Sequence, residues 1–262
     1  LGMPPVVLHA LTAILAETHG AVWVTGPTGS GKTTSLYAAL QALDTRHRNV
    51  LTIEDPIEYK LPRIGQMAVK PKIGLTFAQG LRHILRQDPD VILVGETRDL
   101  ETAEIAVRAS LTGHLVFSTL HTNDALGAVV RLIDMGIPAY LVASATRGIL
   151  AQRLVRVLCP HCSRPVPLSP VFREVFGSRL DLLDGVVPRE PVGCAQCHDG
   201  YRGRTGIYEW IGMNESLRAI IRRGGAPEEL SQNVKEYKIP DLLEDALEKA
   251  GRGVTSLSEI QR

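Results

Sequence analysis

One segment near the start of the chain matches a phosphate-binding loop at every defining position. Residues 26–33 read GPTGSGKT, which is the pattern G-x-x-x-x-G-K-[ST]. In such a loop the glycines let backbone N–H groups surround phosphate oxygens, the lysine adds a positive charge and the final hydroxyl binds Mg²⁺. The pattern therefore predicts a nucleoside triphosphate as ligand. The residues predicted to bind it are Gly26, Pro27, Thr28, Gly29, Ser30, Gly31, Lys32, Thr33 and Thr34.

The sequence on either side of this loop has the pattern that the loop requires. Residues 21–24 form a short apolar run, as expected for a strand covered on both faces of a parallel sheet. After the loop, apolar residues recur at the i, i+3, i+4 and i+7 positions of an amphipathic helix: Leu36, Ala39, Leu40 and Leu43. The N-terminus of such a helix points at the phosphates. A glycine-rich turn without a ligand is the alternative, and this combination argues against it.

Strand-like and helix-like segments alternate from residue 21 to about residue 158. Further strands are predicted at 50–53, 91–94 and 115–120. Helices between them have start and stop signals, with Thr76 and Asp99 as N-caps and Gly136 as a C-terminal cap. This order is typical of an α/β fold with a RecA-like parallel sheet and a phosphate loop.

The remainder of the chain has a different character. Beyond residue 206 the pattern becomes helical, with helices predicted at 216–223, 227–237 and 240–250. We therefore predict three parts. They are a RecA-like nucleotide-binding domain at 1–157, a small tetracysteine subdomain at 158–206 and a helical subdomain at 207–262.

Charge and hydropathy limit the class of protein. The chain has 29 Lys and Arg residues against 28 Asp and Glu, and 5% of its residues are aromatic. The sequence thus has no stripe of basic and aromatic residues, which argues against a nucleic acid partner and against a DNA-handling RecA-like motor. No apolar run approaches the length of about 18 residues that a spanning helix needs, so we expect a soluble intracellular chain. The chain begins at Leu1 and its first methionine is Met3. We expect a piece of a longer protein, and a processed terminus is the alternative.

The four cysteines form two C-x-x-C pairs: Cys159, Cys162, Cys194 and Cys197. Four thiolates in two such turns suit tetrahedral Zn²⁺ in a reducing compartment, where disulfides are disfavoured. His161 and His198 lie beside the pairs and are possible substitute ligands. Structural zinc is the prediction. Reduced cysteines without metal and a redox pair are the alternatives.

Acidic residues follow two of the predicted strands. Glu96 comes directly after the strand at 91–94 and Gly95, and Glu54, Asp55 and Glu58 follow the strand at 50–53. Open α/β sheets place ligand-facing groups at the carboxyl ends of their strands. A carboxylate there is suited to order the attacking water or the metal shell during nucleotide hydrolysis. The alternative for each is a solvated turn or a helix cap.

Two histidines flank the strand predicted at 115–120. His114 precedes it and His121 follows it. Both are interpretable as ordinary residues at strand ends. The second interpretation is that these imidazoles register a γ-phosphate and transmit its loss to the next helix.

Taken together, these segments resemble the secretion-ATPase superfamily, specifically the ATPases of type II secretion and type IV pilus assembly. The matching segments are 26–37, 52–59 (TIEDPIEY), 85–99, 112–124, 159–162 (CPHC) and 200–206 (GYRGRTG). The resemblance implies ATP and Mg²⁺ as ligands, with Lys32 and Thr33 in contact with them. It also implies a catalytic glutamate at Glu96 or Glu54.

The same resemblance implies γ-phosphate sensing by His114 and His121, and partners for the whole protein. Members of this superfamily form hexameric rings at the cytoplasmic face of the bacterial inner membrane, where ATP hydrolysis drives assembly of a pilus or pseudopilus. They carry N-terminal domains that supply arginines to the nucleotide and dock the membrane partner. We expect those domains to be missing here and hydrolysis by this fragment to be weak.

A type II secretion ATPase is the main hypothesis from this resemblance. The four cysteines favour the assembly and secretion branches of the superfamily, because the pilus-retraction ATPases typically lack them. A type IV pilus assembly ATPase is a close alternative. A nucleotide-gated interaction module with little turnover is the alternative from another class.

Overall fold

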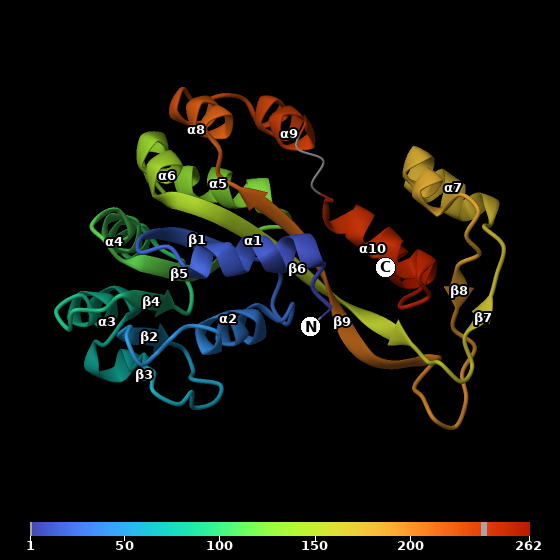
Figure 1. Cartoon of the computed structure of the whole chain (residues 1–262), viewed down its shortest axis with the longest axis horizontal. Helices are drawn as coiled ribbons and strands as arrows, with labels where there is room; N and C mark the ends of the chain where they lie inside the picture. Colours follow the sequence, from blue (N-terminus) through green and yellow to red (C-terminus); the bar gives the residue numbers. More distant parts are fainter. Residues whose placement is uncertain (1, 237–239) are drawn as a thin grey trace. The chain divides into compact units, whose positions relative to one another are not determined.

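The computed structural model describes residues 2–236 and 240–262 (Figure 1). Leu1, the start considered above, and Tyr237, the predicted end of one helix, lie outside the described residues. Contacts between residues divide the chain into two compact units. The larger unit comprises the described residues of Pro5–Ala151 and Trp210–Ile239. The smaller unit comprises the described residues of Leu1–Pro4, Gln152–Glu209 and Pro240–Arg262. The division into three domains stays a prediction.

A seven-stranded sheet with the order β3-β2-β4-β5-β1-β6-β9 organises the described residues. Its strands are β1 (Gly20–Thr25), β2 (Val50–Glu54), β3 (Gly65–Ala68), β4 (Val91–Val94), β5 (Leu115–Leu120), β6 (Thr146–Leu158) and β9 (Tyr201–Gly212). β1 pairs in parallel with β5 and β6, and β2 pairs in parallel with β3 and β4. Every residue of β1, β4 and β5 is buried, as expected for parallel strands covered on both faces. The predicted parallel α/β sheet is confirmed.

The helices of the larger unit are α1 (Pro5–Leu15), α2 (Lys32–Gln41), α3 (Phe77–Ile84), α4 (Leu100–Leu111), α5 (Ala125–Asp134), α6 (Ala139–Ala145), α8 (Glu215–Arg222) and α9 (Pro227–Glu236), with a 3₁₀ turn η1 (Pro71–Ile73). From β1 to α5 these helices follow strands as predicted, whereas the other helices of the unit lie outside that alternation. Thr76 and Asp99 are N-caps whose side chains accept backbone hydrogen bonds, as predicted. Gly136 follows α5 with a φ of 104°, a conformation that suits the residue after a helix. α8 packs against α6 and α9 (Figure 1).

Strand β9 corrects one part of the sequence analysis. It continues to Gly212, so the helical part begins with α8 at Glu215 and not at residue 207. Ile207, Trp210 and Ile211 on this strand are buried. Strands β3 and β6 were also missed by the predicted pattern.

The smaller unit contains the cysteines and a separate apolar core. Its further elements are the antiparallel pair β7 (Arg164–Pro165) and β8 (Arg189–Glu190), the helices α7 (Pro170–Phe176), α10 (Leu242–Gly251) and α11 (Leu257–Gln261), and a 3₁₀ segment η2 (Gly177–Leu183). Leu180, Leu183, Leu247 and Leu257 form the centre of that core. The Pro-rich segment between the cysteine pairs therefore folds onto α10 and α11 by burying leucine side chains.

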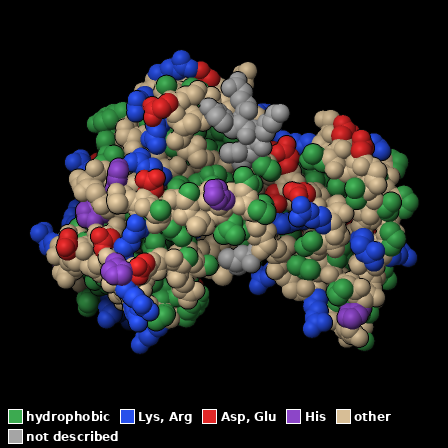
Figure 2. Space-filling model, in the orientation of Figure 1, with side chains coloured by type: hydrophobic (Ala, Val, Ile, Leu, Met, Phe, Trp, Pro, Cys, Tyr) green, Lys and Arg blue, Asp and Glu red, His purple; other side chains and the backbone are tan. Residues whose placement is uncertain are grey.

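Surface charge agrees with the near-equal numbers of acidic and basic residues. On the face shown in Figure 2, positive and negative side chains are interspersed. None of the helices in the described part of the chain is both long enough and apolar enough to cross a membrane.

Candidate nucleotide site and cysteine cluster

The predicted phosphate loop connects the buried strand β1 to helix α2. Gly29 and Gly31 have φ values of 79° and 87°, in the left-handed region that glycine adopts without steric cost. A Cβ atom built on Gly29 meets nothing within 4 Å, so the space beside this residue is open. Pro27 and Thr28 are exposed and Thr33, in the first turn of α2, is half-buried. The loop therefore has the backbone geometry and open space that phosphate binding needs.

Lys32 lies folded back onto this loop. Its Nζ donates hydrogen bonds to the carbonyl oxygens of Gly26 at 2.7 Å and Pro27 at 3.0 Å. Burial lowers the pKa of Lys32, and the negative charge of Glu96 partly offsets that effect. Lys32 is thus buried beside a carboxylate, with its ammonium group held by weak neutral acceptors that a phosphate can replace.

Glu96 lies just beyond the end of β4, and its side chain is 15% exposed. Its Oε1 accepts from Arg98 Nε at 2.5 Å and lies 3.0 Å from His121 Nε2. Burial raises the pKa of Glu96, but the hydrogen bond and charge of Arg98 and the charges of His121 and Lys32 outweigh it, so the pKa is lowered. The structure therefore holds this carboxylate ionised and next to the phosphate loop.

The sheet register explains why these groups meet. Thr25, at the end of β1, pairs with Leu120, at the end of β5, and Val94, at the end of β4, pairs with Ser118. The carboxyl ends of the three strands lie side by side, so the segments that follow these strands lie together. Lys32, Glu96 and His121 come from these three segments.

Glu54 has a different environment. The residue is 3% exposed, and its carboxylate accepts from the hydroxyl groups of Tyr37 and Thr52, the latter at 2.6 Å, and from Gln66 Nε2 at 3.1 Å. Burial and the hydrogen bond to Glu54 raise the pKa of Tyr37. These contacts join Glu54 to helix α2 and to the edge strand β3. The structure therefore surrounds Glu54 with protein donors.

The other two residues of the acidic cluster are exposed. Asp55 and Glu58 both lie at the surface after β2. The charge of Asp55 acts on Arg98, whose pKa is raised first by its hydrogen bond to Glu96. Asp55 is therefore close to the cluster around Glu96, while Glu58 lies near Tyr37.

His114 and His121 lie at opposite ends of β5. The backbone carbonyl of His114 accepts from Gly20 N at the start of β1 (3.1 Å), and its Nδ1 lies 3.0 Å from the carbonyl oxygen of Ala109. Since a parallel strand rises about 3.3 Å per residue, the two histidines are separated by roughly 20 Å. The structure brings His121 to Glu96 but leaves His114 at the opposite, amino-terminal end of β5.

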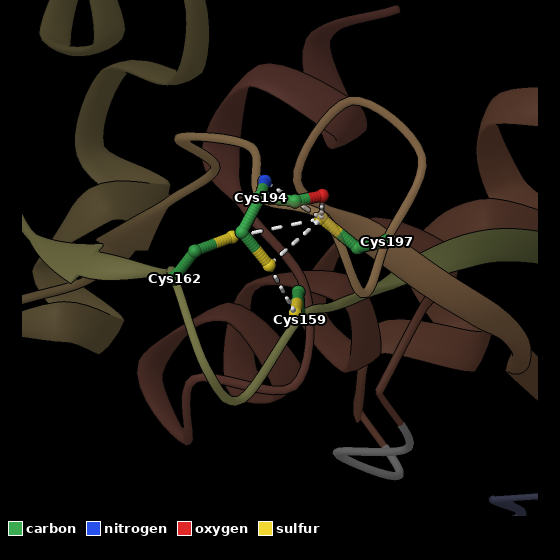
Figure 3. A group of neighbouring side chains, drawn as sticks. All are labelled: Cys159, Cys162, Cys194 and Cys197. Carbon is green, nitrogen blue, oxygen red and sulfur yellow. Dashed lines mark hydrogen bonds between the residues drawn. The ribbon is translucent and has the colours of Figure 1, made fainter.

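The four cysteines of the smaller unit converge, as Figure 3 shows. All four sulfurs lie within 4.8 Å of one another, with Sγ–Sγ distances of 3.9 Å for Cys159–Cys194, 3.7 Å for Cys162–Cys197 and 3.6 Å for Cys194–Cys197. These distances exclude disulfides, whose S–S length is about 2.05 Å. They match the spacing of about 3.8 Å that follows from tetrahedral zinc with Zn–S bonds of about 2.3 Å. The donor set therefore fits a structural Zn²⁺.

The two neighbouring histidines are separate from this cluster. Among the described residues, the group that fits a metal contains the four cysteines and neither His161 nor His198. The ring of His198 is 94% exposed and lies 3.2 Å from Asp199. Substitution of a cysteine ligand by either imidazole is thus not supported by the geometry.

Sequence reasoning missed three residues around the nucleotide site. Arg98 lies two residues after Glu96. Its positive charge so close to an acidic residue at a strand end could have indicated that the two side chains pair. Tyr37 occupies an inward-facing position of α2 and resembles an ordinary core residue in the sequence. Thr25 ends an apolar strand, and its contacts across the sheet depend on the fold.

Comparisons with known proteins identify the family of the chain. The family model described as "Type II/IV secretion system protein" matches residues 1–262. The type II secretion system protein E of Aeromonas hydrophila is 49% identical over 263 residues, which cover 100% of this chain and 52% of that protein. The type II secretion system ATPase E of Vibrio cholerae serotype O1 is 50% identical, with 95% of this chain and 49% of that protein covered. The chain thus spans about half the length of these curated relatives.

Solved structures have the same fold. The pilus retraction motor PilT with bound ADP has a TM-score of 0.72 and 30% identity, covering 99% of this chain and 64% of that one. The ATPase DotB of Legionella pneumophila has a TM-score of 0.70 and 26% identity, covering 99% of this chain and 62% of that one. From the family match over its whole length and the identity of about half its residues to curated members, the chain belongs to the type II/IV secretion system protein family.

Proposed function

We propose that this chain binds ATP with Mg²⁺ and hydrolyses it to ADP and phosphate, as the motor part of a type II secretion protein. The observation that carries the proposal is the convergence of Lys32, Glu96 and His121 beside a complete phosphate loop. A relative of about 50% identity is named an ATPase, and a structural neighbour holds ADP. Type IV pilus assembly is the close alternative, and the names of the curated relatives favour secretion.

Each residue of the site has a role that follows from its chemistry. The backbone N–H groups of the loop and the Lys32 ammonium bind the phosphates. To do so, Lys32 gives up its hydrogen bonds to the carbonyl oxygens of Gly26 and Pro27 and donates to phosphate oxygens instead. Thr33 is the hydroxyl suited to bind Mg²⁺, which neutralises phosphate charge when bound. The ionised Glu96 accepts a hydrogen bond from the attacking water and orients it in line with the γ-phosphorus.

The histidine and the remaining acidic residues have supporting roles in the proposal. His121, at 3.0 Å from Glu96, contacts the γ-phosphate and registers its loss. Asp55 and Glu58 contribute to the water and metal shell from the surface loop after β2. Only the family resemblance supports sensing by His114, because this residue lies at the end of β5 away from Glu96 and His121.

The function of the whole protein is part of the same proposal. We propose a homo-hexamer at the cytoplasmic face of the inner membrane, held there by secretion machinery proteins that bind segments beyond this chain. The four cysteines hold a structural Zn²⁺ that fixes the two turns of the smaller unit. The proposal keeps a nucleotide-binding part at 1–157 and a cysteine part from residue 158, and the helical part follows β9 and begins with α8 at Glu215.

Steady-state phosphate release tests the hydrolysis. Glu96→Gln keeps the shape of the side chain and removes its charge, so we expect kcat to fall by about 100-fold or more. Glu101→Gln, an exposed acidic residue on α4 paired with Arg82, is the matched control and stays within about twofold of the parent. A Glu96→Gln variant as fast as the parent contradicts the assignment. Tight ATP binding without turnover by the parent supports the nucleotide-gated interaction module instead.

A further inference from the structure

Two hydrogen-bonded links hold the strand ends around Glu96 and His121. Glu96 lies between Gly95, whose carbonyl accepts from Thr119 Oγ1 at 2.7 Å, and Thr97, whose Oγ1 lies 2.8 Å from Ser118 Oγ. Both partners belong to β5. The residues on each side of Glu96 are therefore fixed to the strand that leads into His121.

Thr25 forms the second link, between the phosphate loop and His121. Its Oγ1 lies 2.6 Å from Thr122 Oγ1, accepts from Thr122 N at 2.9 Å and lies 3.2 Å from the carbonyl oxygen of Leu120. Leu120 and Thr122 are the two neighbours of His121. Thr25 is fully buried and immediately precedes Gly26, the first residue of the phosphate loop.

The chain of hydrogen bonds from Thr25 extends through Thr122 to the start of helix α5. Thr122 Oγ1 donates to the carbonyl oxygen of Asp124 at 2.8 Å, so the Thr25 hydroxyl is the donor in its contact with Thr122. Asp124 in turn caps α5 by accepting from Gly127 N. One buried hydroxyl thus joins the start of the phosphate loop to both the His121 loop and the start of α5.

We propose that Thr25 is a positioning residue that fixes His121, and through His121 the carboxylate of Glu96, relative to a nucleoside triphosphate in the phosphate loop. The inference deepens the proposed function and rests on it. Displacement of the loop on binding phosphate moves Thr25, and its hydroxyl passes that movement through its two hydrogen bonds to Thr122, the residue after His121. Since a small misplacement of a catalytic group is costly in rate, the link affects turnover more than binding.

The matched variants separate positioning from folding. Thr25→Val keeps the size and β-branching of the side chain and removes the hydroxyl, while Thr25→Ser keeps the hydroxyl. Thr146→Val is the control, because Thr146 is equally buried on the neighbouring strand β6 and its hydroxyl accepts from Trp23 Nε1 at 3.1 Å, away from the phosphate loop. Thermal unfolding of each variant reports any common loss of stability.

In the ATPase assay, Thr25→Val is expected to lower kcat by about tenfold with KM for ATP changed by less than about twofold. Thr25→Ser and Thr146→Val stay within about twofold of the parent kcat. Thr25→Val combined with His121→Gln has the same kcat as His121→Gln alone, because both act through one group. Equal losses of kcat in Thr25→Val and Thr146→Val, or losses that multiply in the double variant, overturn the proposal.

A binding readout keeps this inference separate from the proposed hydrolysis. The side-chain NMR signal of His121, assigned by its loss in His121→Gln, is recorded with and without Mg²⁺ and a non-hydrolysable ATP analogue. The nucleotide-induced shift of that signal is expected in the parent and in Thr25→Ser, and is lost in Thr25→Val at saturating analogue. A full shift in Thr25→Val contradicts the link even if the parent hydrolyses no ATP, whereas absence of hydrolysis in the parent contradicts the proposed function alone.

Discussion

At the scale of single residues, the charge around Glu96 is the property with the clearest chemical consequence. Three groups from three segments face this carboxylate: Lys32 from the phosphate-loop helix, Arg98 from its own loop and His121 from the loop after β5. Asp55 faces Arg98 from the loop after β2. A lowered pKa suits a carboxylate that must stay ionised to orient water, and because it makes Glu96 a weaker base, it favours a hydrogen bond to the water over full proton abstraction.

Arg98→Gln tests this electrostatic role. The variant removes a hydrogen bond and a positive charge, so the pKa of Glu96 rises toward its ordinary value. Since the ionised form is active, the acid limb of the kcat profile is expected to move to higher pH. Arg252→Gln, which removes an exposed arginine paired with Glu248 on α10, is the control and leaves the profile unchanged. An acid limb at the same pH in Arg98→Gln and in the parent contradicts the role of Arg98.

Spacing in the sequence predicted the phosphate loop and the cysteine quartet as groups and put Glu96 at a strand end, whereas for His121 the residues alone also allowed an ordinary strand-end histidine. Their chemistry is written into short patterns, and a parallel sheet brings strand ends together without further information. The surroundings of Glu54 are different, because the partners of this carboxylate depend on which side chains α2 and β3 present to it. No local pattern contains that information.

At the scale of elements, the buried network around Glu54 joins three parts of the larger unit. Tyr37 comes from α2, Glu54 and Thr52 from β2, and Gln66 from β3. The ring of Tyr59 lies edge-to-face against Tyr37 with centroids 4.7 Å apart. The network therefore holds the phosphate-loop helix against the edge of the sheet by satisfying a buried carboxylate.

Tyr37→Phe measures the contribution of this network. The variant keeps the ring and removes one donor to Glu54, so we expect the free energy of unfolding to fall by about 1–3 kcal/mol, the cost of an unsatisfied buried group. Urea unfolding provides the measurement. Tyr140→Phe, which changes an exposed tyrosine on α6, is the control and changes the free energy by less than about 0.5 kcal/mol. Equal stabilities of Tyr37→Phe and the parent contradict this account of Glu54.

Strand β9 illustrates why some elements escaped sequence analysis. Gly203 and Gly206 interrupt its residues, and glycine lowers the propensity for a strand. Gly203 has a φ of 80°, which is unusual inside a strand. The segment is extended because it pairs at the edge of the sheet beside β6, a tertiary contact that outweighs local preference.

At the scale of the whole molecule, the two units have separate sources of stability. The larger unit has the buried sheet and the predicted nucleotide site, and the smaller unit has the leucine core and the cysteine cluster. Ligands that bind only the folded state stabilise the part that binds them. Nucleotide and zinc are therefore expected to act on different parts of the chain.

Differential scanning calorimetry tests this separation. An ADP concentration of 100 times its Kd, with Mg²⁺, adds about 2.7 kcal/mol to the stability of the unit that binds it. We expect ADP to raise one unfolding transition and a zinc chelator to lower another, with about one equivalent of zinc released. Cys162→Ser is expected to reproduce the effect of the chelator. A single transition that ADP and the chelator move together contradicts independent units.

The most direct test of the central claim is a crystal structure of the chain with Mg²⁺ and a non-hydrolysable ATP analogue. The account predicts that Lys32 Nζ leaves the carbonyl oxygens of Gly26 and Pro27 and bonds to the β- and γ-phosphates, while Glu96 and His121 face the γ-phosphate. A γ-phosphate bound away from Glu96, or a loop in which Lys32 keeps its carbonyl contacts beside the bound nucleotide, contradicts it.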